Sequence, residues 1–154
     1  MRKHIHTEID IAAPTEVVWA TLADLAAYPE WNPYHVKVEG DLSVGSRLVV
    51  DLHKPNGDEL TIKPHVMRIT PGRELTWGGG IRGVFFGEHQ FLLEPVGTAT
   101  HLIHRETFSG FAVRFARLDA IEEGYEGMNQ ALAERAEGWM TRRVAPPRGE
   151  TPWT

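Results

Sequence analysis

Three side chains that can take up and release protons lie on two neighbouring segments in which polar and apolar residues alternate. His89 belongs to segment 85–94, and His104 and Glu106 belong to segment 100–108. An imidazole beside a carboxylate can be held in one tautomer and pass on a proton, and burial shifts the pKa of both groups toward values that suit catalysis. The three residues are therefore candidate catalytic residues for acid-base chemistry such as cyclisation and dehydration.

The spacing of the two segments predicts how these residues meet. Alternation is typical of strands, and a hairpin with its loop at 96–99 sets Pro95 opposite Thr100. Every facing pair of residue numbers then sums to 195, which places His89 opposite Glu106. Because alternate residues share a face, the same side carries Phe91, Leu93, Leu102 and His104. The apolar members of this set predict that the side points inward.

The plain alternative is a buried polar cluster whose members only satisfy one another, because an unpaired buried polar group costs about 1 to 3 kcal/mol. For each residue taken alone, that alternative has slightly more weight. For the cluster as a whole, the polar end of a ligand pocket is favoured, since a few converging polar groups orient ligands in apolar cavities. Two histidines and a carboxylate are also metal-ligand types, but their spacing is not diagnostic. No metal site and no cofactor are predicted.

Aromatic side chains supply candidate walls for a planar ligand, although buried aromatic residues more often belong to a core. Trp77 alternates with Leu75 on an inward face and precedes the glycine run 78–80, which is flexible enough for a pocket mouth. The other residues predicted to contact a ligand are Trp31, Phe91, Phe108, Tyr125 and Met128.

The remaining histidines are predicted to lie on the surface. His4 and His6 share a strand face with Glu8 and Asp10, which is the pattern of a solvated strand. The others occur singly on segments whose facing the pattern does not determine: His35, His53, His65 and His101.

Length and composition indicate one globular domain and exclude several classes of protein. The chain has 154 residues, and 16 basic against 21 acidic residues give a net charge of -5, so no nucleic-acid partner is expected. The absence of cysteine excludes disulfides and thiolate chemistry, and the cytoplasm is the default location. No apolar run reaches the roughly 18 residues of a membrane span, and no export signal is found.

The order of elements predicts an α+β fold. Segment 3–11 reads as a strand, and 15–22 as a helix that begins after Pro14. A second short helix is expected to start at Asp24 and to end at Pro29. Six further antiparallel strands are predicted at 34–39, 47–53, 59–69, 74–78, 85–94 and 100–108.

After Gly110, apolar residues recur every three to four positions from Phe111 to Trp139 and predict one long amphipathic helix. The predicted domain therefore spans 1–144 and is followed by a flexible tail at 145–154. A curved seven-stranded sheet needs a cover for its apolar face, and the long helix supplies it. A helix cannot contact a strongly curved sheet everywhere, so a cavity between the two is expected.

This arrangement resembles the helix-grip fold of the START/Bet v 1-like (SRPBCC) superfamily, particularly its polyketide cyclase/dehydrase-like branch. The resemblance covers about residues 3–139 and rests on the motifs at 13–19, 28–33, 87–91, 104–108 and 124–132. It implies a cavity for lipids, aromatic polyketides, hormones or similar apolar molecules, with catalysis in only some members.

Three functions stay open on the sequence. The first is binding of an apolar, aromatic or polycyclic small molecule with acid-base cyclisation or dehydration by His89, His104 and Glu106. The second is a non-catalytic carrier or sequestering protein that uses the same cavity. A surface-mediated chaperone-cofactor or toxin-antitoxin role, as some relatives of this superfamily have, is a third. The expected partner is a hydrophobic small molecule, and the protein is expected to be a monomer or a homodimer.

Overall fold

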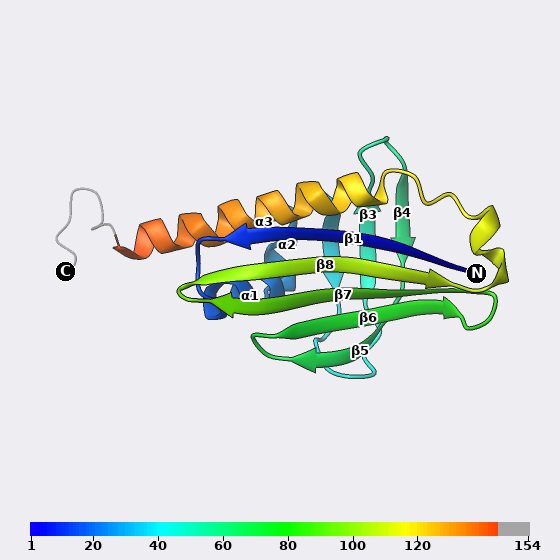
Figure 1. Ribbon diagram of the computed structural model, residues 1–154, viewed down its shortest axis with the longest axis horizontal. Helices are drawn as coiled ribbons and strands as arrows, with labels where there is room; N and C mark the ends of the chain where they lie inside the picture. Colours follow the sequence, from blue (N-terminus) through cyan, green and yellow to red (C-terminus); the bar gives the residue numbers. More distant parts are fainter. Residues whose placement is uncertain (145–154) are drawn as a thin grey trace.

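The fold has two antiparallel sheets, and the long C-terminal helix runs along the larger one beside its edge strand at Arg2–Ile11 (Figure 1). The computed structural model describes residues 1–144, so the predicted tail at 145–154 lies outside the described residues. The larger sheet has the strand order β1 (Arg2–Ile11), β8 (Ala99–Ser109), β7 (Phe85–Val96), β6 (Glu74–Ile81) and β5 (His65–Thr70). The smaller sheet has the order β2 (His35–Glu39), β3 (Val49–His53) and β4 (Glu59–Ile62).

The antiparallel α+β helix-grip fold is confirmed, with eight strands in two sheets in place of seven in one. The predicted strand at 59–69 is divided at Lys63-Pro64, because proline has no N–H for a sheet ladder and restricts the residue before it. The two sheets meet at this break. The N–H of Leu48 donates to the carbonyl of Pro64 at 2.8 Å, and Arg47 forms an isolated bridge with His65.

The predicted register of the β7–β8 hairpin is confirmed. His89 pairs with Glu106 and Phe91 pairs with His104. The loop is shorter than expected, since Val96 and Ala99 already pair and leave a two-residue turn in which Gly97 has a φ of 61°. Each strand is longer by one residue, and the paired residue numbers still sum to 195. The prediction of which residues share the inward face of the hairpin is therefore unchanged by the shorter loop.

The helices differ from the predictions in two places. The short helices are α1 (Thr15–Ala23), η1 (Leu25–Ala27) and α2 (Tyr28–Trp31). Pro29 lies in the first turn of α2, where its missing N–H costs nothing, and does not end a helix. The long helix α3 (Ile121–Val144) begins ten residues later than expected, after a separate turn η2 (Phe111–Phe115). Ala120 has a φ of 64°, which a continuous right-handed helix cannot contain.

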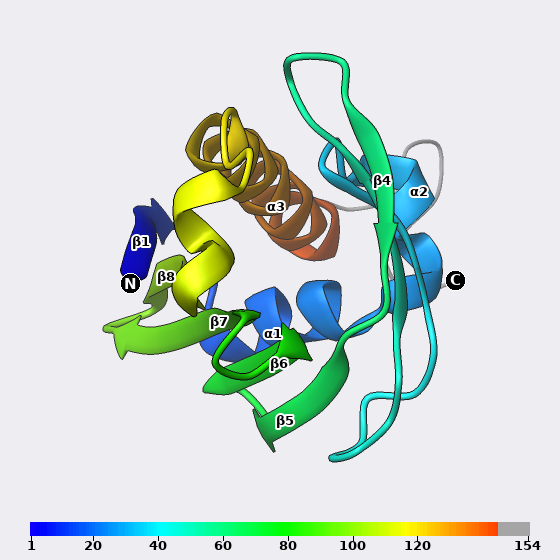
Figure 2. The same ribbon diagram turned by 90° about the vertical axis from the view of Figure 1, so that its right-hand side faces the viewer.

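The view nearly along α3 shows both sheets curving around it (Figure 2). The helix turns its buried side chains toward the sheets: Ile121, Tyr125, Met128, Leu132 and Ala136. Phe111 and Phe115, predicted to continue this buried face, are 59% and 77% exposed. Within residues 1–144, no helix combines the length and the hydropathy that a membrane span needs.

Candidate ligand cavity and proton-transfer site

A cavity of about 390 Å³ lies between the two sheets and the start of α3. This volume falls in the range of small-molecule sites. The apolar part of its lining comes from both sheets and from the segment leading into α3: Leu52, Leu60, Ile62, Phe85, Phe108, Leu118 and Ile121. The structure thus contains a largely apolar cavity where the curved sheet and the helix are not in contact.

The residues predicted as a site divide into three groups. Five of them line the cavity: His89, Glu106, Trp77, Phe108 and Tyr125. Three are fully buried in the layer that packs behind the lining: Phe91, His104 and Met128. Trp31 lies elsewhere, in a second pocket.

The His89 and His104 rings are joined in a hydrogen-bonded chain that ends on β1. His89 Nε2 and His104 Nε2 are 2.7 Å apart, and His104 Nδ1 is 2.8 Å from Asn129 Oδ1. Asn129 Nδ2 donates to Thr7 Oγ1 at 2.8 Å, and the Thr7 hydroxyl donates to the carbonyl of His104 at 2.7 Å. The single hydroxyl hydrogen of Thr7 is thereby used, so Asn129 must offer its amide to Thr7 and its oxygen to His104.

This chain determines the tautomers of both rings. His104 donates from Nδ1 to Asn129, which leaves a lone pair on Nε2 of the neutral ring. His89 therefore donates from Nε2, and its Nδ1 carries a lone pair. Within the described residues, that Nδ1 atom is buried and has no hydrogen-bond partner. His89 itself lines the cavity, so its Nδ1 is an acceptor that the described part of the protein leaves without a partner.

Burial keeps both rings neutral. It lowers the pKa of His104 to about 3, against a smaller opposing effect of the hydrogen bond to Asn129. It also lowers the pKa of His89 well below the usual range, and the charges of His104 and His35 add to this effect. Neither ring is a cation near neutral pH, so the pair acts as a hydrogen-bonding unit.

Among the residues that line the cavity, Glu106 has a pKa raised to about 7. Burial raises its pKa from 4.5 to about 7, although the hydroxyl of Tyr125 donates a hydrogen bond to Oε1 and partly opposes the rise. The pKa of Tyr125 is raised well above 10, first by burial and then by the Glu106 charge. Glu106 and His89 pair in register, but each bonds to a different partner. A carboxyl with a pKa of about 7 can serve as base or as acid at physiological pH.

His35 belongs to the site, and its predicted surface position is wrong. Its side chain is 2% exposed, lines the cavity and lies 5.2 Å from the His89 ring and 5.4 Å from the Trp77 ring, measured between ring centroids. A bulge between His35 and Lys37 breaks the strict alternation, so the two do not share a face. Asn32 Oδ1 accepts from the His35 N–H at 2.9 Å and holds the start of the strand.

Tyr34 is a second cavity residue that the sequence did not identify. Its ring packs edge-on against Tyr125 at a centroid distance of 5.4 Å. Burial raises its pKa above the usual range, and the nearby charge of Glu106 adds to the rise. Its hydroxyl is therefore a neutral donor beside the Glu106 carboxyl.

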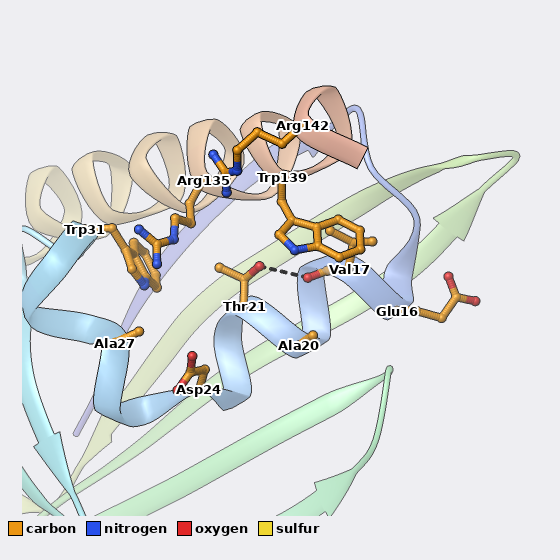
Figure 3. Close-up of a pocket in the computed structure, with 10 residues that line it drawn as sticks. All are labelled: Glu16, Val17, Ala20, Thr21, Asp24, Ala27, Trp31, Arg135, Trp139 and Arg142. Carbon is orange, nitrogen blue, oxygen red and sulfur yellow. Dashed lines mark hydrogen bonds between the residues drawn. The ribbon is translucent and has the colours of Figure 1, made fainter. Parts of the chain in front are cut away.

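The second pocket, of about 400 Å³, lies between α1 and the C-terminal part of α3 (Figure 3). Trp139 extends from α3 toward α1 there, and Arg135 of the same lining donates to Glu30 at 3.3 Å. None of the groups of the hydrogen-bonded chain lines this second pocket. Within residues 1–144, no group of three or more His, Asp or Glu side chains is arranged to hold a metal ion.

The curved sheets, the covering helix and the cavity between them define a helix-grip protein. The chain belongs to the family described as "Polyketide cyclase / dehydrase and lipid transport", whose sequence profile matches residues 2–137. The resemblance to this superfamily is thereby confirmed. No curated protein matches the chain.

Solved structures with the same fold have low sequence identity to this chain. The Zhui aromatase/cyclase from Streptomyces sp. R1128 is 18% identical with a TM-score of 0.69, covering 97% of this chain and 100% of that one. Protein NE0264 from Nitrosomonas europaea is 14% identical with a TM-score of 0.70, covering 90% and 96%. Ara h 8.0201 is 13% identical with a TM-score of 0.64, covering 92% and 99%. At such identities the likeness shows the fold alone.

Proposed function

We propose that the protein binds an apolar, aromatic or polycyclic small molecule in the cavity and catalyses its cyclisation and dehydration by proton transfer. One observation carries the proposal: Glu106, with a pKa of about 7, and the unpaired His89 Nδ1 belong to side chains that line the same apolar cavity. The family description, which names cyclases and dehydrases, and the aromatase/cyclase among the structural neighbours support it.

In this mechanism Glu106 transfers the proton. Its carboxylate removes a proton from a carbon next to a carbonyl of the ligand, and the electron pair moves to the carbonyl oxygen. The neutral hydroxyl of Tyr34 donates to that oxygen as negative charge develops. The enolate carbon then attacks a second carbonyl of the same molecule, and the new alkoxide takes the proton back from Glu106.

Dehydration follows by the same group. Glu106 removes a second proton from the carbon that attacked, which still lies next to the first carbonyl. A carbon–carbon double bond forms between this carbon and the carbon that bears the new hydroxyl. The hydroxyl takes the proton from Glu106 and leaves as water. His89 accepts a hydrogen bond from a ligand hydroxyl at Nδ1. His104 is a positioning residue, because it touches His89 and Asn129 but does not line the cavity.

A carrier without catalysis is the second candidate, and a different observation favours it. Burial keeps His89 and His104 neutral, so the pair can hold a ligand without exchanging protons with it. Binding and proton transfer must therefore be measured separately.

Deuterium exchange into 2-tetralone, a bicyclic aromatic ketone, separates the two functions. We expect wild-type protein in D2O to accelerate exchange at the carbons next to the carbonyl, with a rate that rises through about pH 7 as Glu106 ionises. Glu106→Gln should reduce this acceleration about 100-fold or more. The matched control is Glu88→Gln, because Glu88 precedes His89 on β7 and does not line the cavity.

Side-chain NMR of the histidines measures binding in the same samples. The resonances of His35 and His89 should shift with 2-tetralone, whereas exposed His4 on β1 should not. Binding without accelerated exchange would refute catalysis and favour the carrier. Failure to bind would refute both.

A further inference from the structure

Three cationic side chains line the cavity, and two of them, Lys63 and Arg117, are also exposed to solvent. Lys54 follows β3, Lys63 lies between β4 and β5, and Arg117 lies between η2 and α3. They come from three separate parts of the chain and all contribute to the cavity lining. The Lys54 ammonium donates to the carbonyl of Arg117 at 3.3 Å, which holds two of these segments together.

These cations form no ion pair with a carboxylate in the part of the chain that the structure describes. Glu106 is the one acidic side chain among the lining residues, and burial raises its pKa to about 7, so part of the population is neutral near that pH. The chain as a whole has a net charge of -5, so the sign of charge on these three lining residues is opposite to that of the protein.

We propose that the ligand carries a carboxylate or a similar oxyanion at one end, and that Lys54, Lys63 and Arg117 of the cavity lining bind this end. The inference rests on the proposed function, because it assumes an aromatic body inside the cavity. An oxyanion beside the exposed Lys63 and Arg117 keeps part of its hydration, whereas an oxyanion deeper in the cavity would lose it. The aromatic body then lies in the cavity that Phe108, Trp77 and Glu106 line.

A pair of fluorescent probes that differ by one charge tests this assignment. N-phenyl-1-naphthylamine is neutral, and 1-anilinonaphthalene-8-sulfonate is the same molecule with a sulfonate. The test variant combines Lys54→Gln, Lys63→Gln and Arg117→Gln. The control variant removes three positive charges from exposed residues outside the cavity lining: Lys3→Gln, Arg47→Gln and Arg73→Gln.

We expect the test variant to bind the sulfonate probe about tenfold more weakly than wild type, because it loses three charge contacts to the sulfonate that solvent partly screens. Its affinity for the neutral probe should stay within about twofold, which also shows that the cavity is folded. The control variant should bind both probes like wild type. Displacement of either probe by 2-tetralone locates it in the cavity.

The outcomes separate this inference from the proposed function. Failure of wild type to bind the neutral probe would remove the proposed function and this inference together. If wild type binds the neutral probe but the test variant binds the sulfonate probe as tightly as wild type does, the inference is overturned and the proposed function stands. An equal loss for both probes, or an equal loss in the control variant, would also overturn it.

Discussion

Replacing Glu106 by glutamine should make the protein more stable than wild type at alkaline pH. The folded state raises the pKa of this carboxyl from 4.5 to about 7, so it holds a proton that the unfolded chain releases. The stability that this proton supplies is fully present below pH 4.5 and is lost as the pH rises through about 7. Glutamine is neutral throughout and can still accept the hydrogen bond from Tyr125.

The magnitude follows from the pKa difference. Each pH unit between the folded and the unfolded pKa corresponds to about 1.36 kcal/mol. A rise from 4.5 to about 7 therefore corresponds to about 3 kcal/mol. The free energy of unfolding of Glu106→Gln, minus that of wild type, should thus increase by about 3 kcal/mol between about pH 4 and about pH 8.

Urea denaturation followed by tryptophan fluorescence at the two pH values measures this difference, and subtracting wild type removes the titration of all other groups. Glu74→Gln is a control of opposite sign. Hydrogen bonds from Thr76 at 2.5 Å and from Arg68 at 2.9 Å lower the pKa of Glu74, so its carboxylate stabilises the fold at high pH and loses this effect as the pH falls. A difference for Glu106→Gln that stays constant with pH would refute the raised pKa and the role of Glu106 as the titrating group.

Two further predictions concern packing and surface charge. A Cβ on Gly124 would lie 2.4 Å from the Tyr34 ring, so Gly124→Ala should lower the free energy of unfolding by about 1 to 3 kcal/mol. A Cβ on Gly127 would have no neighbour within 4 Å, so Gly127→Ala should raise the free energy of unfolding by up to about 1 kcal/mol. Urea denaturation measures both variants, and a change of the same sign in the two would contradict this prediction. His101 bonds to Asp10 at 2.7 Å, which raises its pKa above 6.5, and an NMR titration should show this pKa fall in Asp10→Asn. A wild-type pKa for His101 at or below 6.5 would refute the prediction.

The fold and the hairpin that carries the candidate site follow from local patterns. Alternation sets the inward face of β7 and β8, and a tight turn between them sets the pairing of His89 with Glu106. The division at Pro64 has a sequence signal in the proline itself, which cannot donate a hydrogen bond to a sheet ladder. The late start of α3 depends on Ala120 taking a left-handed conformation, for which alanine gives no signal.

The cavity residues outside the hairpin could not be predicted so readily. The period of two assigns His35 to the same face as Lys37, and only the bulge in β2 places His35 in the cavity. Thr7 and Asn129 are 122 residues apart in the chain and meet only after β1 and α3 have packed together.

The sequence by itself determined the order of the elements, the register of the last hairpin and the residue types that could transfer protons, because these depend on alternation, turns and side-chain chemistry along a few neighbouring residues. The tertiary structure alone decided which proton donor and acceptor atoms are paired and how strongly each group is desolvated. The pKa of Glu106 is raised and that of His104 is lowered because residues distant in sequence pack around both and reduce their contact with water. Desolvation is a property of the packed molecule, and no local pattern encodes it.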